Sequence, residues 1–543
     1  MSAADLPAPQ PDAPGEMIPE CITRDNLTGP YFPSTSRAML QAVIALGVIF
    51  ALTSFNRLNH TDLWGHLDFG RWIVEHRALP AIDPLGANPA TTPVLNSAWL
   101  AQVIGYEVYS WSGHEGLVLG HALLVTLTAG VLMLAVVRRG VPASWAWVAG
   151  LAMFLLDTPI VGTIRPQLFG QLGVALFLLA CSDLSKKWQP LVWLPMVAAL
   201  WANLHGSILM GLAILACYAM GMTWTLYREA QGDFPALLRD RRLGRVWLAL
   251  LLSLGGACLN PHGPELLIKA IFFGEHAALS YISEWRRMTP SSLTGMLLIV
   301  SAVGALALLK YEGKLWPVHE LLLLALFGAA TCSAIRMLAW WALVWTWVVI
   351  PHAASAWRKY RAEHGYAPEA ADGPDSMRTL LAMGVVFATA IIAPPTYGLI
   401  TGRQRGEVPA MVRETPVHLA DEAARRGLAG NFAAPMDWAD FLVWKSGEQL
   451  RPMIYGHIHL ASMSTFEDYS KIYAGHELWL QILHSQKVRY LFVSQDRNKE
   501  LANLVLQESR ANAGRVRLLY VDQRGLIAEI APAPADTARA SIK

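Results

Sequence analysis

The sequence predicts an α-helical polytopic membrane protein that carries an α/β domain towards its C-terminus. Hydrophobic residues make up 54% of the 543 residues and charged residues only 15%, which is too apolar for an ordinary soluble protein. Uncharged runs recur between residues 38 and 400, and they reach the roughly 17 to 25 residues that an α-helix needs to cross a bilayer. After residue 400 the composition becomes that of a soluble domain.

The basic residues of the short loops predict how the spans are oriented. Loops that keep Lys and Arg stay in the cytoplasm, and every second loop keeps them, as at Arg138 and Arg139 or at Lys186 and Lys187. The N-terminus is therefore predicted in the cytoplasm, and an odd number of spans places the C-terminal domain on the outer side. The eleven predicted spans are 38–55, 116–137, 141–157, 166–182, 189–204, 207–227, 246–260, 291–309, 317–335, 337–357 and 378–400.

Composition divides the chain into three parts. Residues 1–36 are rich in Pro and Ala and contain no apolar run, which is typical of a disordered cytoplasmic tail and not of a cleaved signal peptide. Residues 37–400 form the predicted transmembrane domain, with a first outer loop at 56–114 and an outer excursion at 260–290. Residues 401–535 form the predicted extracytoplasmic α/β domain.

Local patterns predict the elements of the two outer regions. Within the first outer loop, 62–76 and 98–111 have the pattern of amphipathic helices that lie along the membrane interface. In the C-terminal part, strand-like runs alternate with helical stretches, which indicates a small α/β fold. The predicted strands are Gly430–Ala433, Pro452–Tyr455, Val488–Ser494, Arg515–Val521 and Leu526–Ile530, and the predicted helices are Asp437–Lys445, Tyr469–His484 and Asn498–Glu508.

The candidate catalytic residues follow the first span. Asp62 and His66 are four residues apart on the first amphipathic helix and face the same way, which suits a general base or a pair of metal ligands. A carboxylate held at the membrane is costly unless it is used. The structural alternative is that Asp62 caps the helix and His66 packs at the interface. Asp83 is a second candidate, although an Asp-Pro pair is also a common turn.

The sequence contains no established motif for a metal or a nucleotide cofactor. No His-Glu-x-x-His spacing occurs, so a divalent metal at Asp62 and His66 stays an open alternative. The sequence contains no phosphate loop, dinucleotide fingerprint or Gly-x-Ser-x-Gly elbow. No cofactor is therefore established by the sequence.

Two arginines at the outer ends of spans are candidates for substrate binding. Arg165 and Arg336 stand alone on the side of the membrane that is otherwise poor in basic residues. A guanidinium there can clamp a lipid phosphate with two parallel hydrogen bonds. The alternative is that both side chains extend to the lipid headgroups.

Four further polar residues occur at the predicted outer face. Asn203 and His205 interrupt a long apolar hairpin at its outer tip, where they either line a cavity or satisfy backbone groups at the turn. His262 and Glu284 belong to the outer excursion at 260–290. For these two residues, substrate binding and a purely structural role are again the alternatives.

Six short motifs occur in a fixed order and contain these candidates. They are Asp62-Leu63-Trp64-Gly65-His66-Leu67 with Gly70, Asp83-Pro84, Arg165-Pro166-Gln167, Asn203-Leu204-His205-Gly206, Asn260-Pro261-His262-Gly263 and Glu284-Trp285. Together with the span layout, their order over residues 37–500 resembles the GT-C membrane glycosyltransferases, the group that includes protein mannosyltransferases and aminoarabinose transferases of lipid A. Within that group the motifs are most similar to those of a bacterial subgroup.

The resemblance implies a function for the outer face of a bacterial inner membrane. Such enzymes move a sugar from a polyprenyl-phosphate carrier to a lipid, glycan or protein acceptor. It implies that Asp62 acts as a base or metal ligand and that Arg165 and Arg336 meet the donor phosphate. The adjacent Asp-Glu pair of the protein mannosyltransferases is missing, because Leu63 follows Asp62. Protein mannosylation is therefore not expected, and the sugar and the acceptor stay open.

Three other functions compete with this hypothesis. A ligase or polymerase of lipid-linked glycans usually depends on a large late loop, whereas the largest membrane-proximal loop here is the first. A transporter or flippase of glycolipid would favour inverted repeats, which the sequence does not contain. A structural membrane anchor would leave Asp62, Arg165 and Arg336 without a role. With 43 basic and 41 acidic residues, no nucleic acid is expected as a partner. The partners that the resemblance implies are membrane lipid, a polyprenyl-phosphate-linked sugar and the lipid, glycan or protein acceptor.

Overall fold

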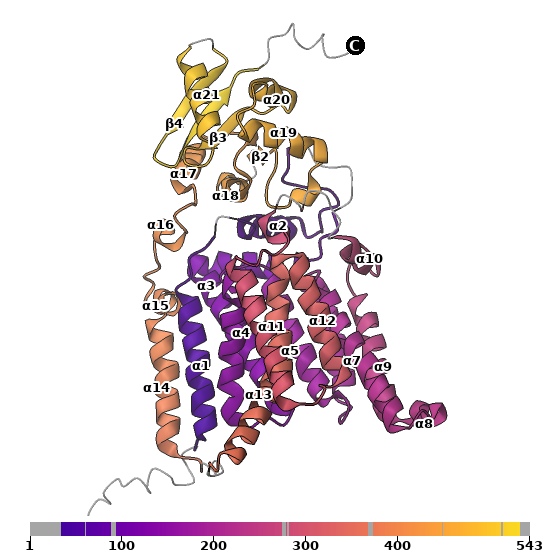
Figure 1. The fold of residues 1–543 in the computed structure, drawn as a ribbon. Coiled ribbons are helices and arrows are strands. Elements are labelled where there is room, and N and C mark those ends of the chain that lie inside the picture. Colours follow the sequence, from indigo (N-terminus) through magenta and orange to yellow (C-terminus); the bar gives the residue numbers. More distant parts are fainter. Residues whose placement is uncertain are drawn as a thin grey trace, which may run out of the picture.

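The computed structural model describes residues 34–59, 61–87, 94–273, 279, 282–366, 373–447, 449–511 and 514–532. A bundle of long helices lies below a smaller α/β layer, and the short helix α2 (Leu63–His76) lies between the two (Figure 1). The predicted N-terminal tail lies outside the described residues except for 34–36. Parts of the predicted outer excursion at 260–290 and the last residues of 401–535 also lie outside them.

The helical, multi-pass fold class is confirmed, whereas the number of spans stays a prediction. Seven helices of the described part are long and apolar enough to cross a membrane, and the bent pair α14 and α15, with 74° between its two parts, would be an eighth. α6 and α12 are apolar but shorter, and α9 begins with basic residues. The bundle helices are α1 (Arg37–Ser54), α3 (Trp99–Arg138), α4 (Ala146–Val161), α5 (Gln167–Leu184), α6 (Pro190–Leu204), α7 (Ile208–Glu229), α9 (Arg241–Ala257), α11 (Leu293–Glu312), α12 (Val318–Ser333), α13 (Leu338–Glu363) and α14 (Ser376–Ile392).

Short elements connect the bundle helices and begin the C-terminal part. Backbone hydrogen bonds join Thr35, just before α1, to Asp375, just before α14. These two helices therefore start at the same end and run parallel. The short elements are η2 (Ala143–Trp145), α8 (Phe234–Arg239), α10 (Glu265–Phe272), η5 (Ser283–Trp285), η6 (Ile335–Met337), α15 (Pro394–Thr401) and α16 (Glu407–Ala410).

The first outer loop packs directly on the top of the bundle. The amphipathic helix predicted at 98–111 is the first part of α3, and Gly113, with φ +60°, separates it from the membrane part. α2 lies against this first part, because a Cβ atom at Gly70 would overlap the carbonyl oxygen of Gln102. Below the kink, the buried Glu115 accepts hydrogen bonds from Arg405 at 2.6, 2.7 and 3.1 Å. The chain that leaves α15 is thereby held against α3.

Five strands form one mixed sheet in the order β2-β1-β3-β5-β4. β1 pairs in parallel with β2 and β3, while β5 is antiparallel to both β3 and β4. The register places Phe432 opposite Tyr490 and Leu491 opposite Ala528. The elements are α17 (Val417–Arg425), β1 (Gly430–Ala433), α18 (Met436–Ser446), β2 (Leu450–Pro452), η7 (Ile458–Leu460), α19 (Met463–Tyr473), α20 (Trp479–Ser485), β3 (Tyr490–Ser494), α21 (Lys499–Arg510), β4 (Val516–Val521) and β5 (Gly525–Ile530).

The two faces of the sheet belong to different hydrophobic cores. Alternation along the strands sends Phe432 and Phe492 to one face and Leu491 and Val493 to the other. The second face is covered by α19, α20 and α21. The first face is covered by α17 and α18, and its core continues without interruption into α2, including the fully buried Trp64. The first outer loop and the C-terminal sheet thus share one core.

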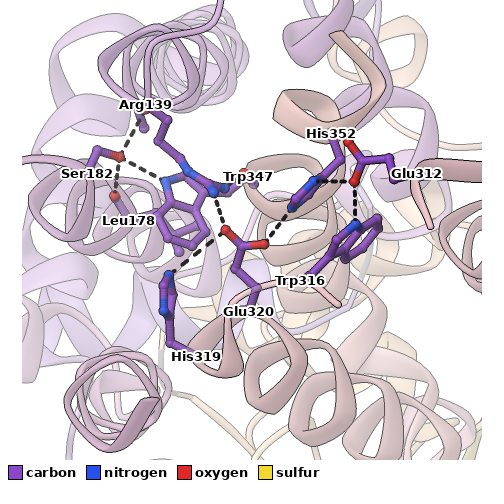
Figure 2. Close-up of polar contacts among 10 residues, drawn as sticks. Arg139, Leu178, Ser182, Glu312, Trp316, His319, Glu320, Trp347 and His352 are labelled. Atoms are coloured by element: carbon purple, nitrogen blue, oxygen red, sulfur yellow. Dashed lines mark hydrogen bonds and ion pairs between the residues drawn. The ribbon is translucent and has the colours of Figure 1, made fainter. Parts of the chain in front are cut away.

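A network of buried polar side chains lies at the opposite end of the bundle (Figure 2). Arg139, at the end of α3, pairs with Glu320 of α12, and its guanidinium lies 4.2 Å from the ring centre of Trp347. His352 of α13 bridges two carboxylates, with Nε2 2.7 Å from Glu320 and Nδ1 2.9 Å from Glu312. Charged groups at such depth are stable only when they are paired. The network therefore joins four helices of the bundle.

Glu320→Gln is expected to destabilise the protein strongly, because it leaves the Arg139 guanidinium without its buried partner. Glu320 is 1% exposed, and removing one member of a buried ion pair costs about 3–5 kcal/mol. Thermal unfolding in detergent measures the change. Glu229→Gln is the matched control, since Glu229 pairs with Arg242 at the surface and should cost less than about 1 kcal/mol. Equal melting of the two variants would contradict a stabilising role for the network.

The predicted orientation can be tested with reporter fusions. A reporter placed after Arg361, at the end of α13, should report the cytoplasm, because the neighbouring loop keeps basic residues. A reporter placed after Thr401, at the end of α15, should report the outer side of the membrane. Finding both reporters on the same side would contradict the orientation on which the outer position of the candidate site depends.

Candidate active site

Asp62 lies immediately before α2 in a strained backbone conformation. Its φ of +32° lies in the left-handed region, which costs a non-glycine residue about 1–3 kcal/mol and recurs at functional sites. The Asp62 side chain makes no capping hydrogen bond to α2. Its Oδ2 atom instead lies 3.5 Å from Nη1 of Arg165. The geometry therefore does not support the capping alternative.

Arg165 precedes α5 and joins two carboxylates. Its Nη1 donates to Oε2 of Glu284 at 2.7 Å, and its Nη2 donates to the other carboxylate oxygen. Burial disfavours the charged guanidinium, but the hydrogen bonds that Arg165 donates to Glu284 and the charge of Asp62 outweigh burial and raise the pKa of Arg165. Burial likewise opposes ionisation of Glu284, yet the bonds from Arg165 leave its pKa below the ordinary value. Both groups are therefore charged at neutral pH.

Arg336 brings a second guanidinium to the same place. It lies on η6, and its guanidinium carbon is 4.6 Å from the ring centre of Trp285, the residue after Glu284. Its Nη2 donates to Oε1 of Gln167 at 3.0 Å. A backbone hydrogen bond from Ile335 to the carbonyl of Arg286 holds η6 against η5. Four segments that are distant in sequence thus bring together Asp62, Arg165, Glu284 and Arg336.

Two neutral imidazoles border this group of charges. Gln102 Nε2 donates to Nδ1 of His66 at 3.1 Å, while Gln102 Oε1 accepts from Asn96 at 2.6 Å. Burial, and then the nearby His205 and Arg165, lower the pKa of His66 to about 3. His66 therefore carries its single proton on Nε2 and is a hydrogen-bond donor there.

His205 is the second neutral imidazole. Burial, Arg336 and Arg165 lower the pKa of His205 to about 3, and its Nδ1 accepts from the backbone of Ser207.

Asp83 and Asn203 have protein partners that account for their polar groups. Asp83 is buried and accepts from the backbone of Leu85 at 3.0 Å and from the hydroxyl of Tyr455 at 2.7 Å. Asn203 accepts from Trp99 Nε1 and donates to two backbone carbonyls, all at 2.8 Å. These contacts hold the first outer loop under the sheet and the α6 end against α3. A direct role for either residue stays a prediction.

His262 lies in the turn before α10, where its backbone N–H donates to Asn260 Oδ1 at 2.9 Å. Burial lowers the pKa of His262 although Glu265 opposes this shift. None of the described hydrogen bonds or ion pairs joins it to the residues around Asp62. A role for His262 in substrate binding therefore also stays a prediction.

The C-terminal part contributes a carboxyl group that sequence analysis missed. Asp440 of α18 is 1% exposed and accepts from the backbone N–H of Gly456 at 3.1 Å. A Cβ atom at Gly456 would lie 2.5 Å from Oδ2 of Asp440 and 2.8 Å from Oδ1 of Asp62. Both carboxyl groups therefore border the same small space. A Cβ atom at Gly65 would overlap Asp440 from the opposite side.

The environment of Asp440 favours its uncharged form. Burial, and then the charges of Asp62 and Asp68, raise the pKa of Asp440 well above its ordinary value of 3.8. The neighbouring His457, 4.9 Å from His66 between ring centres, has its pKa lowered well below the ordinary value by burial and by His66. We refer to Asp440 and His457 as the roof of the site, since they border Asp62 and His66 from the C-terminal part of the chain. Both side chains are polar, and their surroundings favour the uncharged form of each.

The described residues around Asp62 do not fit a divalent metal. Asp62 faces Arg165, and His66 uses Nδ1 to accept from Gln102 while Nε2 carries the proton. No group of three or more His, Cys, Asp or Glu side chains in the described part of the chain is arranged as metal ligands. A coordinated metal needs unprotonated ligands that converge on one point. We therefore assign no step to a metal.

Asp440→Asn is expected to remove a pH dependence of stability. The folded protein keeps the Asp440 proton to a higher pH than the unfolded chain does. Between these two pKa values the folded state binds more protons, and its stability falls as the pH rises. One such proton lowers the free energy of unfolding by at most about 1.4 kcal/mol per pH unit. Apparent Tm in detergent, measured from about pH 5 to about pH 8, should fall more for the wild-type protein than for the variant.

Asp496→Asn is the matched control for this measurement, because Asp496 is an exposed carboxylate in the same part of the chain. Its curve of Tm against pH should follow that of the wild-type protein. Parallel curves for Asp440→Asn and the wild-type protein would show that Asp440 titrates normally, and the assignment of an uncharged roof would then be wrong.

Comparison with solved structures finds this architecture in membrane glycosyltransferases of low sequence identity. The arabinofuranosyltransferase AftD from Mycobacteria aligns with a TM-score of 0.54 and 14% identity over 92% of this chain and 40% of AftD. The Archaeoglobus fulgidus oligosaccharyltransferase tethered with an acceptor peptide aligns with a TM-score of 0.51 and 12% identity over 84% of this chain and 69% of its own. No protein-family model and no curated protein matches the sequence. The chain therefore has the fold of the GT-C membrane glycosyltransferases.

Proposed function

We propose that the protein transfers a sugar from a polyprenyl-phosphate carrier to a lipid, glycan or protein acceptor at the outer face of the membrane. One observation carries this proposal. Asp62 is held in a strained turn, makes no capping hydrogen bond, and faces the guanidinium of Arg165 with Arg336 beside it. A carboxylate next to two cations supplies the groups that transfer from a lipid phosphate requires.

The two arginines bind the phosphate of the donor. A guanidinium has five N–H donors in a planar fork, and the described contacts of Arg336 account for one of them, the bond to Gln167. Glu284 keeps Arg165 oriented through two hydrogen bonds. The donor phosphate joins this group through Arg336. Asp62, Glu284, Arg165 and Arg336 together carry no net charge, so the phosphate is held by direct charge-assisted hydrogen bonds from the guanidinium and not by an excess of positive charge.

Asp62 acts as the general base. The acceptor hydroxyl oxygen attacks the anomeric carbon of the donor sugar, and the hydroxyl proton passes to the Asp62 carboxylate. The bond between the anomeric carbon and the phosphate oxygen breaks, and its electron pair leaves with the polyprenyl phosphate. Arg165 and Arg336 stabilise the negative charge that develops on that oxygen. His66, neutral and protonated at Nε2, donates a hydrogen bond to a substrate oxygen and does not compete for the proton.

Asp62→Asn is expected to abolish transfer without unfolding the protein. Loss of a general base lowers turnover by about 10² to 10⁴-fold, whereas loss of a simple helix cap would cost about 1 kcal/mol of stability or less. Turnover of a polyprenyl-phosphate-linked sugar by the purified variant measures the first effect, and thermal unfolding measures the second. Arg336→Ala should raise KM for the donor in the same assay, because a phosphate partner is lost.

Glu75→Gln is the matched control, since Glu75 is an exposed carboxylate on the same helix α2. It should transfer sugar at the wild-type rate. Wild-type turnover by a folded Asp62→Asn protein would contradict the proposal, and Asp83 would then be the next carboxylate to test.

A further inference from the structure

After the neighbouring parallel strands β1 and β3, the chain turns towards opposite edges of the sheet. β1 leads through α18 to β2 at one edge of the sheet, and β3 leads through α21 to β4 at the other edge. α18 covers the sheet face of Phe432, whereas α21 covers the face of Leu491. In open α/β sheets this reversal creates a crevice outside the carboxyl ends of the strands, and ligands bind in it.

A pocket of about 270 Å³ lies at this position. The first turn of α18 contributes Asp437, and the loop from β3 to α21 contributes Arg497 and Asn498. α19 closes the pocket with Tyr469 and Tyr473. Pockets for larger organic ligands usually measure about 300–1,000 Å³, so this crevice has room for one small ring and not for a nucleotide. We refer to these residues as the switch-point crevice.

The two tyrosines give the switch-point crevice a fixed aromatic wall. The Tyr469 hydroxyl accepts from the backbone N–H of Met436 at 2.8 Å, and the Tyr473 hydroxyl donates to the carbonyl of Phe492 at 2.9 Å. Their ring centres are 4.6 Å apart. Because the hydroxyl groups are held by the backbone, both rings are fixed in orientation. Rigid aromatic carbon of this kind packs against the C–H groups of a sugar ring.

The polar rim of the crevice is neutral overall. Arg497 forms an ion pair with Asp437, and the amide of Asn498 lies beside them. The pair offers N–H donors and carboxylate acceptors side by side, which matches the hydroxyl groups of a sugar. An anion is disfavoured, because Asp437 and Glu500 already occupy the first turns of α18 and α21. The loop after β1 also lacks the glycines of a phosphate site.

α18 connects the switch-point crevice to the candidate active site. Asp437 lies in its first turn and lines the crevice, while Asp440, three residues later, borders the same space as Asp62. Three residues of helix correspond to a rise of about 4.5 Å. The crevice and the space beside Asp62 therefore border the same first turns of α18, and the charge of Asp437 acts on Asp440.

We propose that the switch-point crevice binds a sugar residue of the acceptor, so that the acceptor of this enzyme is a glycan or a glycolipid. That the bound sugar belongs to the acceptor rests on the proposed function, whereas sugar binding in the crevice does not. Sugar binding needs neither the donor nor Asp62. Failure of the crevice and failure of the transfer assignment are therefore distinguishable.

Saturation-transfer NMR with the full-length protein in detergent tests the proposal. The probes are methyl glycosides of glucose, mannose, galactose, arabinose and N-acetylglucosamine, each at millimolar concentration, with inorganic phosphate as a competitor. At least one glycoside should bind to the wild-type protein and to Asp62→Asn. Arg497→Ala and Asp437→Asn should each weaken this binding by about tenfold or more, the effect of losing one good hydrogen bond.

Arg515→Ala is the matched control, because Arg515 is an exposed arginine of the same part of the chain that pairs with Glu508 at 2.7 Å. It should bind glycosides as the wild-type protein does. The proposal is overturned if no glycoside binds to the wild-type protein, if both crevice variants bind as well as Arg515→Ala does, or if inorganic phosphate displaces the glycosides. A folded Asp62→Asn protein that still transfers sugar would instead contradict only the proposed function.

Discussion

The contact between α2 and α18 is the interaction on which the candidate site depends. Trp64 of α2 is fully buried, and its ring centre lies 5.2 Å from that of Phe441 in an edge-to-face arrangement. A helix of 14 residues is marginal by itself in water, so α2 needs this partner to keep its position above the bundle. Because Asp62 lies directly before α2, its strained backbone is held by the same contact. The carboxylate of the proposed base is thus positioned by a part of the chain almost 380 residues away.

Two glycines leave room for the Asp440 carboxyl group where α18 packs against α2, because they carry no side chain. Gly65 and Gly456 lie on either side of Asp440, and a Cβ atom at either position would collide with its carboxyl group. Asp440 is consequently almost fully buried, and burial raises the pKa of its carboxyl group. An ionised Asp440 would repel the Asp62 carboxylate, so this repulsion adds to burial in favouring the uncharged form of Asp440. Packing and protonation are therefore coupled at this point.

Sequence patterns predicted most of the helices and strands and the charged half of the site, but not its roof. β2 ends at Pro452, where the predicted strand Pro452–Tyr455 begins, and the predicted helix Tyr469–His484 is divided into α19 and α20. Asp62, Arg165 and Arg336 were identified because each is a charge near the end of an apolar span, which is a signal that a single sequence carries. Glu284 was identified from its place in the outer excursion at 260–290. Asp440 carries no such signal, since a carboxylate in a helix of soluble composition is ordinary. Its special environment arises only when α18 docks on α2.

The same limit explains why other candidates were harder to interpret from sequence. Asp83 and Asn203 were assigned to the site because they are polar and lie at the outer face. Their environment is set by Tyr455 and Trp99, which are 372 and 104 residues away in the chain. Periodicity and local motifs report on neighbours within a turn or a strand. Hydrogen-bond partners at such separations follow from the fold alone.

α13 links the candidate site around Arg336 with the buried network around Glu320, which lie at opposite ends of the bundle. Arg336 lies in the turn that leads into this helix, while Trp347 and His352 lie further along it and join the buried network with Arg139 and Glu320. An isolated apolar helix can slide or rotate against its neighbours, because dispersion contacts have no strong direction. Hydrogen bonds and ion pairs do have direction, so the network holds α13 in one rotational setting. That setting also determines where the Arg336 guanidinium meets Trp285. The position of Arg336, the proposed phosphate-binding arginine, therefore depends on contacts at the far end of the bundle as well as on those in the site.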